Sequence, residues 1–378
     1  MMRVLHVITG LGQGGAEAVL FRLIQTSSSP DMHTVVSMRD EGFYGERLRS
    51  LGASVSALEI GSQRGFLSAF FKLRQVVRDV APDVIQTWMY HADLLGGLVG
   101  RIEQVPVVWG LHNSNFEKKH TKSLTRKVVG LCAVLSRFVP RKIVTCSNVA
   151  RALHEEIGYC RSKFKLIQNG VSVGEFARDV DAGSDVRRLL GIPENHLVYV
   201  NVARFHPQKD HGNLIEAFER AFSDRDDVHL ILCGAGVSAD NRDFSTLLRD
   251  RKSVGRIHCL GSRSDVAKIL SGSDYFVLSS LGEAFPCSIV EAMASELPCI
   301  VTDVGDCSEI VGDTGWAVSA CSPTQLESAL RTTSQITTEK RAEIGERARS
   351  RVIENYTIEK MSKEYDVIWR EVCKGLAL

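Results

Sequence analysis

The sequence of 378 residues lacks the features of a membrane-spanning or disulfide-stabilised protein. No apolar run approaches the roughly 20 residues that a spanning helix needs. The first residues, MMRVLHVITG, carry one basic residue and run directly into a strand-like pattern, which favours the start of a fold over a signal peptide. None of the 10 cysteines forms a Cys-x-x-Cys pair, so we expect reduced, buried thiols in a cytoplasmic protein and neither a disulfide framework nor a zinc site.

The charge is balanced over the whole chain but unevenly distributed along it. Residues 1–172 hold 22 Lys and Arg against 13 Asp and Glu, a net charge of +9, whereas the remainder holds 24 against 32, a net charge of −8. We expect the basic half to face an anionic partner, although chance segregation of charge would give the same pattern. A chain of this length is expected to form about two domains.

Short β-rich segments alternate with helical segments through both halves. They are RVLHVIT, HTVVSM, DVIQTW, VPVVWGL and KIVTCS in the first half, and HLVYVNVARF, VHLILCG, RIHCLG, DYFVLSS and PCIVTDV in the second. Helical segments such as 66–80 separate them, which predicts parallel sheets in two Rossmann-like domains. The join is expected within 167–185, where Asn-Gly and polar residues interrupt the pattern. Apolar residues at helical spacing in 358–372, behind Thr357 as an expected N-cap, predict a final packing helix.

A glycine-rich turn, GLGQGGAE, follows the first predicted strand. Gly10, Gly12 and Gly15 satisfy the G-x-G-x-x-G pattern. Glycines let backbone N–H groups approach an anion, and the N-terminus of the next helix adds a favourable dipole. A dinucleotide oxidoreductase would also place an acidic residue after the second strand, and Asp40 leaves that alternative open.

Two cations mark the first strand of the second half. Arg204 falls at the carboxyl end of that strand, and Lys209 lies five residues later, before a predicted helix. Ligands of open α/β sheets bind at strand carboxyl ends. Two cations there suit a diphosphate, which arginine can bind with two parallel hydrogen bonds, although two surface cations on a loop would look the same.

The stretch SSLGEAFPCSIVEAMASELP, residues 279–298, places Glu283 in a turn and Glu291 inside a short helix. Pro286 suits the first helical position, which would leave the N–H groups of residues 287–289 available to a ligand. Glu291 would lie roughly 7.5 Å along the helix axis. A nucleotide sugar matches this layout, because carboxylates accept hydrogen bonds from hydroxyls while amides and cations bind phosphates. A helix whose charged residues face solvent or an arginine is the alternative.

The pair Glu283-x7-Glu291, with EAFP ahead of EAMAS, resembles the signature of the retaining glycosyltransferases of family 4, which have the GT-B fold. The order of the other motifs also matches the family: GLGQGGAE, IQNGV, VARFHPQKDH and LGSRSDV precede the two glutamates and PCIVTDVGDCSEIV follows them. The resemblance therefore covers most of the chain. It implies an α/β protein with two Rossmann-like domains facing across a cleft. The acceptor-binding domain would span 1–172, the nucleotide-sugar-binding domain 173–357, and a helix in 358–378 would return toward the first domain.

The resemblance also implies roles for individual residues. Arg204 and Lys209 would stabilise the departing diphosphate. Glu283 would contact the donor sugar, and Glu291 the ribose hydroxyls. His112 would lie between donor and acceptor, although a lone histidine at a strand end is more often structural. The other implied donor-binding residues are Gly14, Gly15, Arg263 (through its backbone), Phe285, Pro286, Cys287, Ser288 and Ile289.

Three positions depart from the usual family pattern. Ala284 replaces a commoner Gly or Ser, Cys287 a commoner Leu or Asn, and Glu296 a commoner Gly. The first two would tune which sugar fits, and none removes a charged group that the mechanism needs.

The implied reaction moves a sugar from a UDP- or GDP-sugar to a saccharide acceptor with retention of configuration, in synthesis of a bacterial cell-surface polysaccharide such as lipopolysaccharide or exopolysaccharide. Negative charge grows on the departing diphosphate, where cations and helix amides would stabilise it. We therefore expect no cofactor and no metal beyond the nucleotide-sugar co-substrate. The Asp-x-Asp patterns at 179–181 and 224–226 lie in polar loops, unlike the metal-binding pattern of the other main glycosyltransferase fold.

The acceptor is expected on the first domain, with His91 and Asn113 on its side. Residues 117–142 carry eight Lys and Arg against one Glu, and a helical apolar stripe could face either the core or a membrane. That stripe is Leu124, Val128, Leu131, Leu135 and Phe138, with Val129, Cys132 and Ala133 on the other face. We expect a lipid-linked acceptor at the cytoplasmic face of the inner membrane, with an ordinary core helix as the alternative.

Other functions stay open at this stage. A sugar-nucleotide epimerase on the same fold would keep the donor groove but lack an acceptor surface, which the basic first half disfavours. A non-catalytic scaffold subunit has no reason to keep buried charges that cost stability. An NAD-dependent oxidoreductase rests on the glycine pattern alone. Nucleic acid is not an expected partner, because no stacking aromatics interleave with the cations of 117–142.

Overall fold

The computed structural model describes residues 2–60, 65–112 and 123–374, and the chain divides into two compact units. Unit 1 comprises Met1–Gly170 and Ile358–Leu378, and unit 2 comprises Val171–Thr357. The sequence predicts that the chain passes from one domain to the other after residues 172 and 357. In the structure it does so after residues 170 and 357.

Unit 1 is built on a parallel sheet with strand order β3-β2-β1-β4-β5-β6-β7. Its strands are β1 Val4–Ile8, β2 His33–Ser37, β3 Ser54–Ala57, β4 Val84–Trp88, β5 Val107–Leu111, β6 Lys142–Thr145 and β7 Phe164–Leu166. Its α-helices are α1 Gly15–Gln25, α2 Gly45–Ser50, α3 Phe66–Val80, α4 Tyr90–Ile102, α5 Ser123–Leu135, α6 Asn148–Ile157 and α15 Ile358–Lys374. The central strands β1, β4 and β5 are buried along their whole length, as crossover helices on both faces require.

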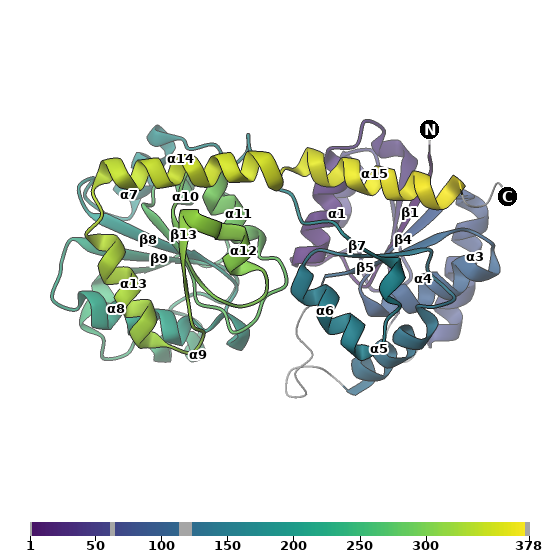
Figure 1. Ribbon diagram of the computed structural model, residues 1–378, viewed down its shortest axis with the longest axis horizontal. Helices are drawn as coiled ribbons and strands as arrows, with labels where there is room; N and C mark the ends of the chain where they lie inside the picture. The colour runs from purple at the N-terminus through teal and green to yellow at the C-terminus, as the bar shows by residue number, and fades with distance from the viewer. Residues whose placement is uncertain (1, 61–64, 113–122, 375–378) are drawn as a thin grey trace. The chain divides into compact units, whose positions relative to one another are not determined.

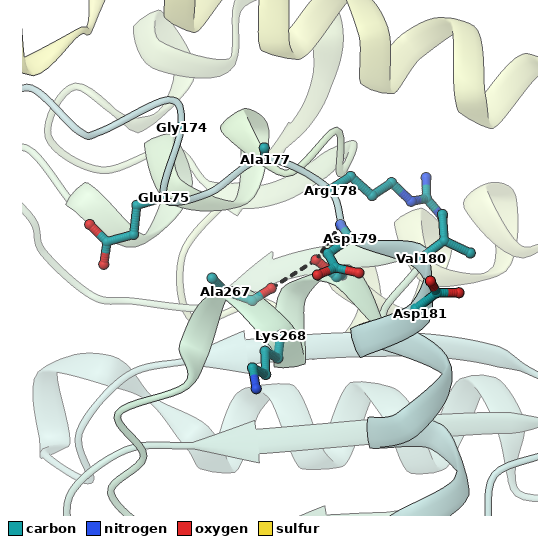
Figure 2. A pocket seen from close by; sticks show the side chains of 10 residues that line it. Gly174, Glu175, Ala177, Arg178, Asp179, Val180, Asp181, Ala267 and Lys268 are labelled. Atoms are coloured by element: carbon teal, nitrogen blue, oxygen red, sulfur yellow. Dashed lines mark hydrogen bonds between the residues drawn. The ribbon is translucent and has the colours of Figure 1, made fainter.

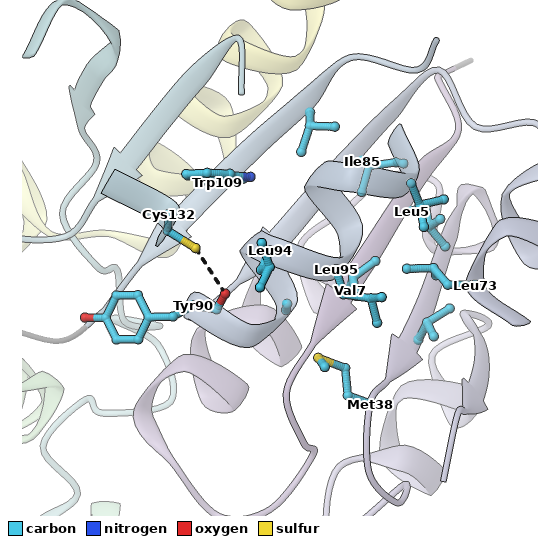
Figure 3. Close-up of a cluster of buried hydrophobic side chains, with 14 of the residues drawn as sticks. Leu5, Val7, Met38, Leu73, Ile85, Tyr90, Leu94, Leu95, Trp109 and Cys132 are labelled. Carbon is cyan, nitrogen blue, oxygen red and sulfur yellow. Dashed lines mark hydrogen bonds between the residues drawn. The ribbon is translucent and has the colours of Figure 1, made fainter. Parts of the chain in front are cut away.

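Helix α4 forms the centre of the packing on one face of this sheet (Figure 3). Leu95 and Val99 are fully buried against the strand residues Leu5 and Ile85. Three glycines of α4 allow the helix to approach the sheet closely: a Cβ at Gly96 would lie 2.6 Å from the Thr87 side chain, and one at Gly100 would lie 2.3 Å from the Val107 side chain. The apolar runs that predicted these elements therefore form one core.

Unit 2 repeats the plan with strand order β10-β9-β8-β11-β12-β13, all parallel. Its strands are β8 Leu197–Val202, β9 Val228–Cys233, β10 Ile257–Cys259, β11 Tyr275–Leu278, β12 Cys299–Thr302 and β13 Gly315–Val318. Its α-helices are α7 Val180–Leu189, α8 His211–Phe222, α9 Arg242–Ser245, α10 Val266–Ser271, α11 Cys287–Ala294, α12 Cys307–Val311, α13 Pro323–Ser334 and α14 Thr338–Asn355.

The last helix, α15, packs on unit 1 although it follows unit 2 in sequence. It lies beside α1 and β4, the yellow ribbon against the purple one in Figure 1. Its predicted apolar face is buried, and Trp369 adds a hydrogen bond from its ring nitrogen to Oε1 of Gln86 at 3.0 Å. The predicted return of the C-terminal helix to the first domain is confirmed.

In each unit the strand order reverses at one point, and open sheets of this kind bind ligands at the carboxyl ends of the strands beside that point. In unit 1 the reversal lies between β1 and β4, and in unit 2 between β8 and β11. The candidate residues follow these strands. Among the residues that the structure describes, no helix is long and apolar enough to span a bilayer.

Candidate functional site

The reversal point of unit 2 brings two predicted catalytic residues into contact. Lys209 ends the short 3-10 turn Pro207–Lys209 after β8, and Glu283 follows β11. The Lys209 ammonium forms an ion pair with Oε1 of Glu283, and the two side chains are only 19% and 10% exposed. The cation predicted for a diphosphate and the carboxylate predicted for sugar hydroxyls therefore meet at one edge of the sheet.

Main-chain hydrogen bonds tie these two loops together. The N–H of Leu281 donates to the carbonyl of Gln208 at 2.8 Å, and the Gln208 side-chain amide donates to the carbonyl of Gly282 at 2.6 Å. The Ser279 hydroxyl lies 3.0 Å from the carbonyl oxygens of both Lys209 and Asp210. The positions of the ion-paired side chains are thus fixed by the same set of contacts.

Sequence analysis missed Ser279, Ser280 and Asp210. Asp210 has a left-handed backbone with φ +46°, and its side chain caps α8 by accepting from the N–H of Asn213. The Ser280 hydroxyl donates to Oε1 of Glu283 at 2.6 Å. The signal that could have found the serines is their position: two small hydroxyl residues directly follow a fully buried strand.

Arg204 lies two residues past the end of β8 and is exposed. Within the described part of the chain it forms no hydrogen bond or ion pair. The structure does not join it to the Lys209–Glu283 pair, and its role in binding the diphosphate stays a prediction.

Helix α11 begins one residue later than the sequence predicts. Pro286 is its N-cap, with φ −76° and ψ 105°, and Cys287 is the first helical residue. The N–H of Ile289 donates to the carbonyl of Pro286 at 3.2 Å, so the expectation that this amide is available to a ligand is wrong. The first turn of α11 still presents Cys287 and Ser288, both partly exposed, at the carboxyl edge of the sheet.

Glu291 lies in the second turn of α11 and is partly buried, whereas Phe285 is buried against the ring of Tyr356. Arg263 is exposed, and its guanidinium forms two hydrogen bonds with the carboxylate of Asp265, at 2.8 and 2.7 Å. This arginine holds the pKa of Asp265 below its usual range. Its side chain is therefore engaged within the protein, which leaves the backbone for the predicted contact with a base.

In unit 1 the glycine-rich turn follows β1 at the reversal point. Gly14 is the N-cap of α1 and Gly15 its first residue. A Cβ at Gly14 would lie 2.3 Å from the carboxylate of Glu17, whereas the space around Gly15 is open to 4 Å. The arrangement agrees with close approach of a ligand to the Gly15 backbone.

The two predicted histidines follow the neighbouring strands β4 and β5. His91 is the second residue of α4, behind Met89, whose φ of +74° is unusual for a residue with a side chain. Burial and the charge of Arg39 lower the pKa of His91. His112 stacks on Trp88 at 5.2 Å between ring centroids, and both of its ring nitrogens are buried without a partner among the described residues. Burial lowers the pKa of His112 to about 4, so its ring is neutral near pH 7. Asn113 lies outside the described residues.

The apolar stripe predicted on 117–142 is divided, because Val128 and Leu135 pack against the core of unit 1 while its other members are exposed. The described part, Ser123 onward, buries Val129, Cys132 and Ala133. Leu124, Leu131, Val134 and Phe138 are instead between 47% and 71% exposed. The alternative in which the whole stripe faces the core is therefore wrong, and the membrane contact stays a prediction.

A hollow of about 600 Å³ in unit 2 contains none of the predicted site residues (Figure 2). It is lined by the chain after Gly174, the start of α7 and one side of α10. The side chains of Arg178 and Lys268 point away from each other there. Asp179 and Asp181 of the first Asp-x-Asp pattern lie beside it. Asp179 is the N-cap of α7 and Asp181 lies in its first turn, so the prediction that this pattern lies in a loop is wrong.

Solved structures with the same architecture define the fold. HepE of Anabaena, solved in complex with UDP-glucose, superposes with a TM-score of 0.85 over the whole of both chains at 20% identity. Sucrose-phosphate synthase of Thermosynechococcus elongatus superposes with a TM-score of 0.79, over 99% of this chain and 100% of that one, at 18% identity. Two parallel-sheet units with this topology are the GT-B fold of glycosyltransferases.

Sequence comparisons then identify the family. Residues 13–175 match "Glycosyltransferase Family 4" and residues 184–351 match "Glycosyl transferases group 1". The chain belongs to glycosyltransferase family 4, whose two domains these two models describe.

Two relatives are named by their reactions. The UDP-Gal:alpha-D-GlcNAc-diphosphoundecaprenol alpha-1,3-galactosyltransferase of Escherichia coli is 27% identical over 63% of this chain and 62% of its own length. The N,N'-diacetylbacillosaminyl-diphospho-undecaprenol alpha-1,3-N-acetylgalactosaminyltransferase of Campylobacter jejuni is 25% identical over 80% of this chain and 82% of its own.

Proposed function

We propose that this glycosyltransferase moves a sugar from a UDP- or GDP-sugar to a lipid-linked saccharide, with retention of configuration, in synthesis of a bacterial cell-surface polysaccharide. The observation that carries the proposal is the ion pair of Lys209 and Glu283 at the reversal point of unit 2. Two relatives whose names specify acceptors linked to diphosphoundecaprenol support the lipid-linked acceptor. The UDP-glucose bound to HepE supports the nucleotide-sugar donor.

The chemistry follows from where charge develops. As the bond to the anomeric carbon breaks, the departing diphosphate gains negative charge. In our proposal, Lys209, Arg204 and the first turn of α11 stabilise that charge. The Glu283 carboxylate accepts hydrogen bonds from the donor sugar. The acceptor hydroxyl then attacks on the face that the diphosphate leaves. Charge neutralisation comes from the protein in this scheme, and we propose that no divalent metal takes part.

A direct assay tests this proposal. The protein is screened by thermal shift against UDP- and GDP-sugars, because a ligand that binds only the folded state raises its melting temperature. The best donor is then incubated with a diphosphoundecaprenol-linked saccharide in the presence of EDTA. We expect a product whose anomeric configuration, measured by NMR, matches that of the donor. An epimerised donor without transfer would instead indicate an epimerase, and loss of activity in EDTA would contradict metal independence.

We further propose that α5 lies on the anionic cytoplasmic face of the inner membrane. The exposed face of α5 and of the turn that follows it combines Leu131 and Val134 of the helix and Phe138 of the turn with the cations Lys127 and Arg137. Residues 123–142 contain no Asp or Glu. A helix with an apolar face flanked by cations binds anionic bilayers by shallow insertion and by charge.

Sedimentation with phosphatidylglycerol liposomes at low salt tests the membrane contact. We expect the parent to co-sediment and the double variant Val134→Ser, Phe138→Ser to lose at least about threefold in partitioning. Val367→Ser is the matched control, because Val367 is 57% exposed on α15 of the same unit. Absence of parent binding, or equal binding by the double variant, would overturn the membrane proposal.

A further inference from the structure

One oxygen of Glu283 receives two donors of different character. The Lys209 ammonium and the Ser280 hydroxyl both bind Oε1, the hydroxyl at 2.6 Å. Lysine carries its charge on a flexible stem of four carbons and can follow a moving partner. Serine has one side-chain torsion and a short reach. Lys209 therefore supplies the positive charge that faces Oε1, whereas the position of the Glu283 carboxylate depends on Ser280.

Ser280 is itself held rigidly. It is fully buried, and its carbonyl accepts a hydrogen bond of 2.6 Å from the hydroxyl of Thr302 at the end of β12. Thr302 is also fully buried. A chain of contacts thus runs from the sheet through Thr302 and Ser280 to the carboxylate of Glu283.

The backbone of Glu283 has no room to shift toward β12. Gly305, in the turn after that strand, has φ +57°, and a Cβ there would lie 2.1 Å from the Glu283 carbonyl oxygen. The N–H of Asp306 donates to the carbonyl of Ala284 at 3.3 Å. With the backbone fixed in this way, the remaining freedom of Glu283 is rotation of its side chain, which the Ser280 hydroxyl restricts.

We propose that Ser280 is a positioning residue that holds the Glu283 carboxylate for the sugar part of the donor. The inference rests on the proposed function, in which Glu283 faces that sugar. A carboxylate fixed at one oxygen presents its acceptor sites in set directions, so it binds hydroxyls of one configuration well and cannot turn to follow another. Ser280 would then contribute to affinity for the sugar and to discrimination between epimers, but not to binding of the diphosphate.

Titration calorimetry separates these contributions. The parent and Ser280→Ala are titrated with UDP, UDP-glucose, UDP-galactose, GDP and GDP-mannose, and the gain in affinity of each sugar over its free diphosphate is compared. We expect Ser280→Ala to bind the free diphosphates as the parent does and to lose about fivefold or more of the gain from the preferred sugar. Ser280→Thr keeps the hydroxyl and is expected to retain most of that gain.

Ser273→Ala is the matched control, because Ser273 is 1% exposed in the same unit and its hydroxyl donates to the Ile269 carbonyl at 2.8 Å. Ser273→Ala is expected to change neither the affinity for the free diphosphate nor the affinity for the nucleotide sugar. Two results would overturn the positioning role alone. One is a Ser280→Ala variant that keeps the full gain in affinity from the sugar. The other is an equal loss of affinity for the free diphosphate and for the nucleotide sugar in both Ser280 variants. Failure of the parent to bind any nucleotide sugar would overturn the proposed function and this inference together.

Discussion

The first five strands of each unit have the same arrangement, β3-β2-β1-β4-β5 in unit 1 and β10-β9-β8-β11-β12 in unit 2. The carboxyl edges of the two sheets nevertheless carry different groups. In unit 2 the loops after β8 and β11 hold Lys209 and Glu283 as an ion pair. In unit 1 the residues after β4 and β5 are His91 and His112, whose pKa values burial lowers.

Under the proposed function, the comparison explains how one scaffold would serve two substrates. A departing diphosphate needs fixed positive charge, and Lys209 of unit 2 would supply it on loops that hydrogen bonds tie together. Unit 1 keeps neutral imidazoles at its edge and an apolar, cationic face on α5, which suit the uncharged saccharide and the lipid part of the proposed acceptor. Function is therefore set by the loops and helix surfaces, because the sheets themselves are alike.

The largest expected effect of a substitution is at Lys209, at the carboxyl edge of unit 2. Lys209→Ala should lower kcat about 10²- to 10³-fold in the transfer assay, because the charge on the departing diphosphate would lose one of its proposed cations. His112→Ala, at the edge of unit 1, should lower kcat less, and Lys268→Ala, an exposed lysine of unit 2, should have no effect. A His112→Ala defect larger than that of Lys209→Ala would reverse the assignment of the two edges.

The second prediction concerns a buried carboxyl of unit 1. Asp93 is fully buried on α4, accepts a hydrogen bond of 2.5 Å from the Thr87 hydroxyl, and has a pKa that burial raises to about 7. Between about pH 4 and 7 the folded state keeps a proton that the unfolded chain has released, so this carboxyl lowers the free energy of unfolding as pH rises through that window. Above pH 7 this carboxyl lowers the free energy of unfolding by about 4 kcal/mol relative to its value below pH 4.

Urea unfolding of the parent and Asp93→Asn at pH 5, 6, 7 and 8 checks this sign. The asparagine does not titrate, so we expect its stability relative to the parent to increase with pH. Neutral histidines such as His112 act in the other direction in both proteins, since their stability contribution is lost as pH falls from about 6.5 toward 4, and they cancel in the difference. A difference that is constant with pH would contradict the buried, protonated carboxyl.

The smallest expected effect lies at the end of α11. Glu296 has a left-handed backbone, φ +62°, and its carboxylate is 4.0 Å from the Arg349 guanidinium. Glycine adopts this conformation without steric cost, so Glu296→Gly should raise the free energy of unfolding by about 0.5 kcal/mol, after the entropy cost of glycine and the weak ion pair are counted. Glu296→Ala keeps the strain and should not raise it. A stability loss in the glycine variant would show that the ion pair outweighs the strain.

Much of this fold could be predicted from the sequence because buried strands are continuous apolar runs. Ten strands fall on predicted segments, whereas β3, β7 and β13 were missed. Those three are short and only partly buried, with sequences such as Ser54–Ala57 that carry little apolar signal. The sequence left two orientations open for α5, toward the core or toward a membrane, because apolar residues lie on both of its faces.

The site could be predicted in part. Lys209 and Glu283 were found because their position after a strand and their charge are visible in the sequence. The residues Ser279, Ser280 and Asp210 were missed because their roles depend on how the loops fold. Ser279 contacts carbonyls 70 and 69 residues away, and Ser280 contacts Glu283 three residues on. The N-cap at Pro286 differs by one residue from the prediction, as helix ends commonly do.

Amide hydrogen exchange with and without saturating UDP-glucose or GDP-mannose tests the central claim most directly. If the donor binds at the carboxyl edge of unit 2, protection will rise in residues 203–210 and 280–289 and stay unchanged around the hollow of Figure 2, residues 174–181 and 267–271. Protection confined to that hollow, with none after β8 and β11, would contradict the account.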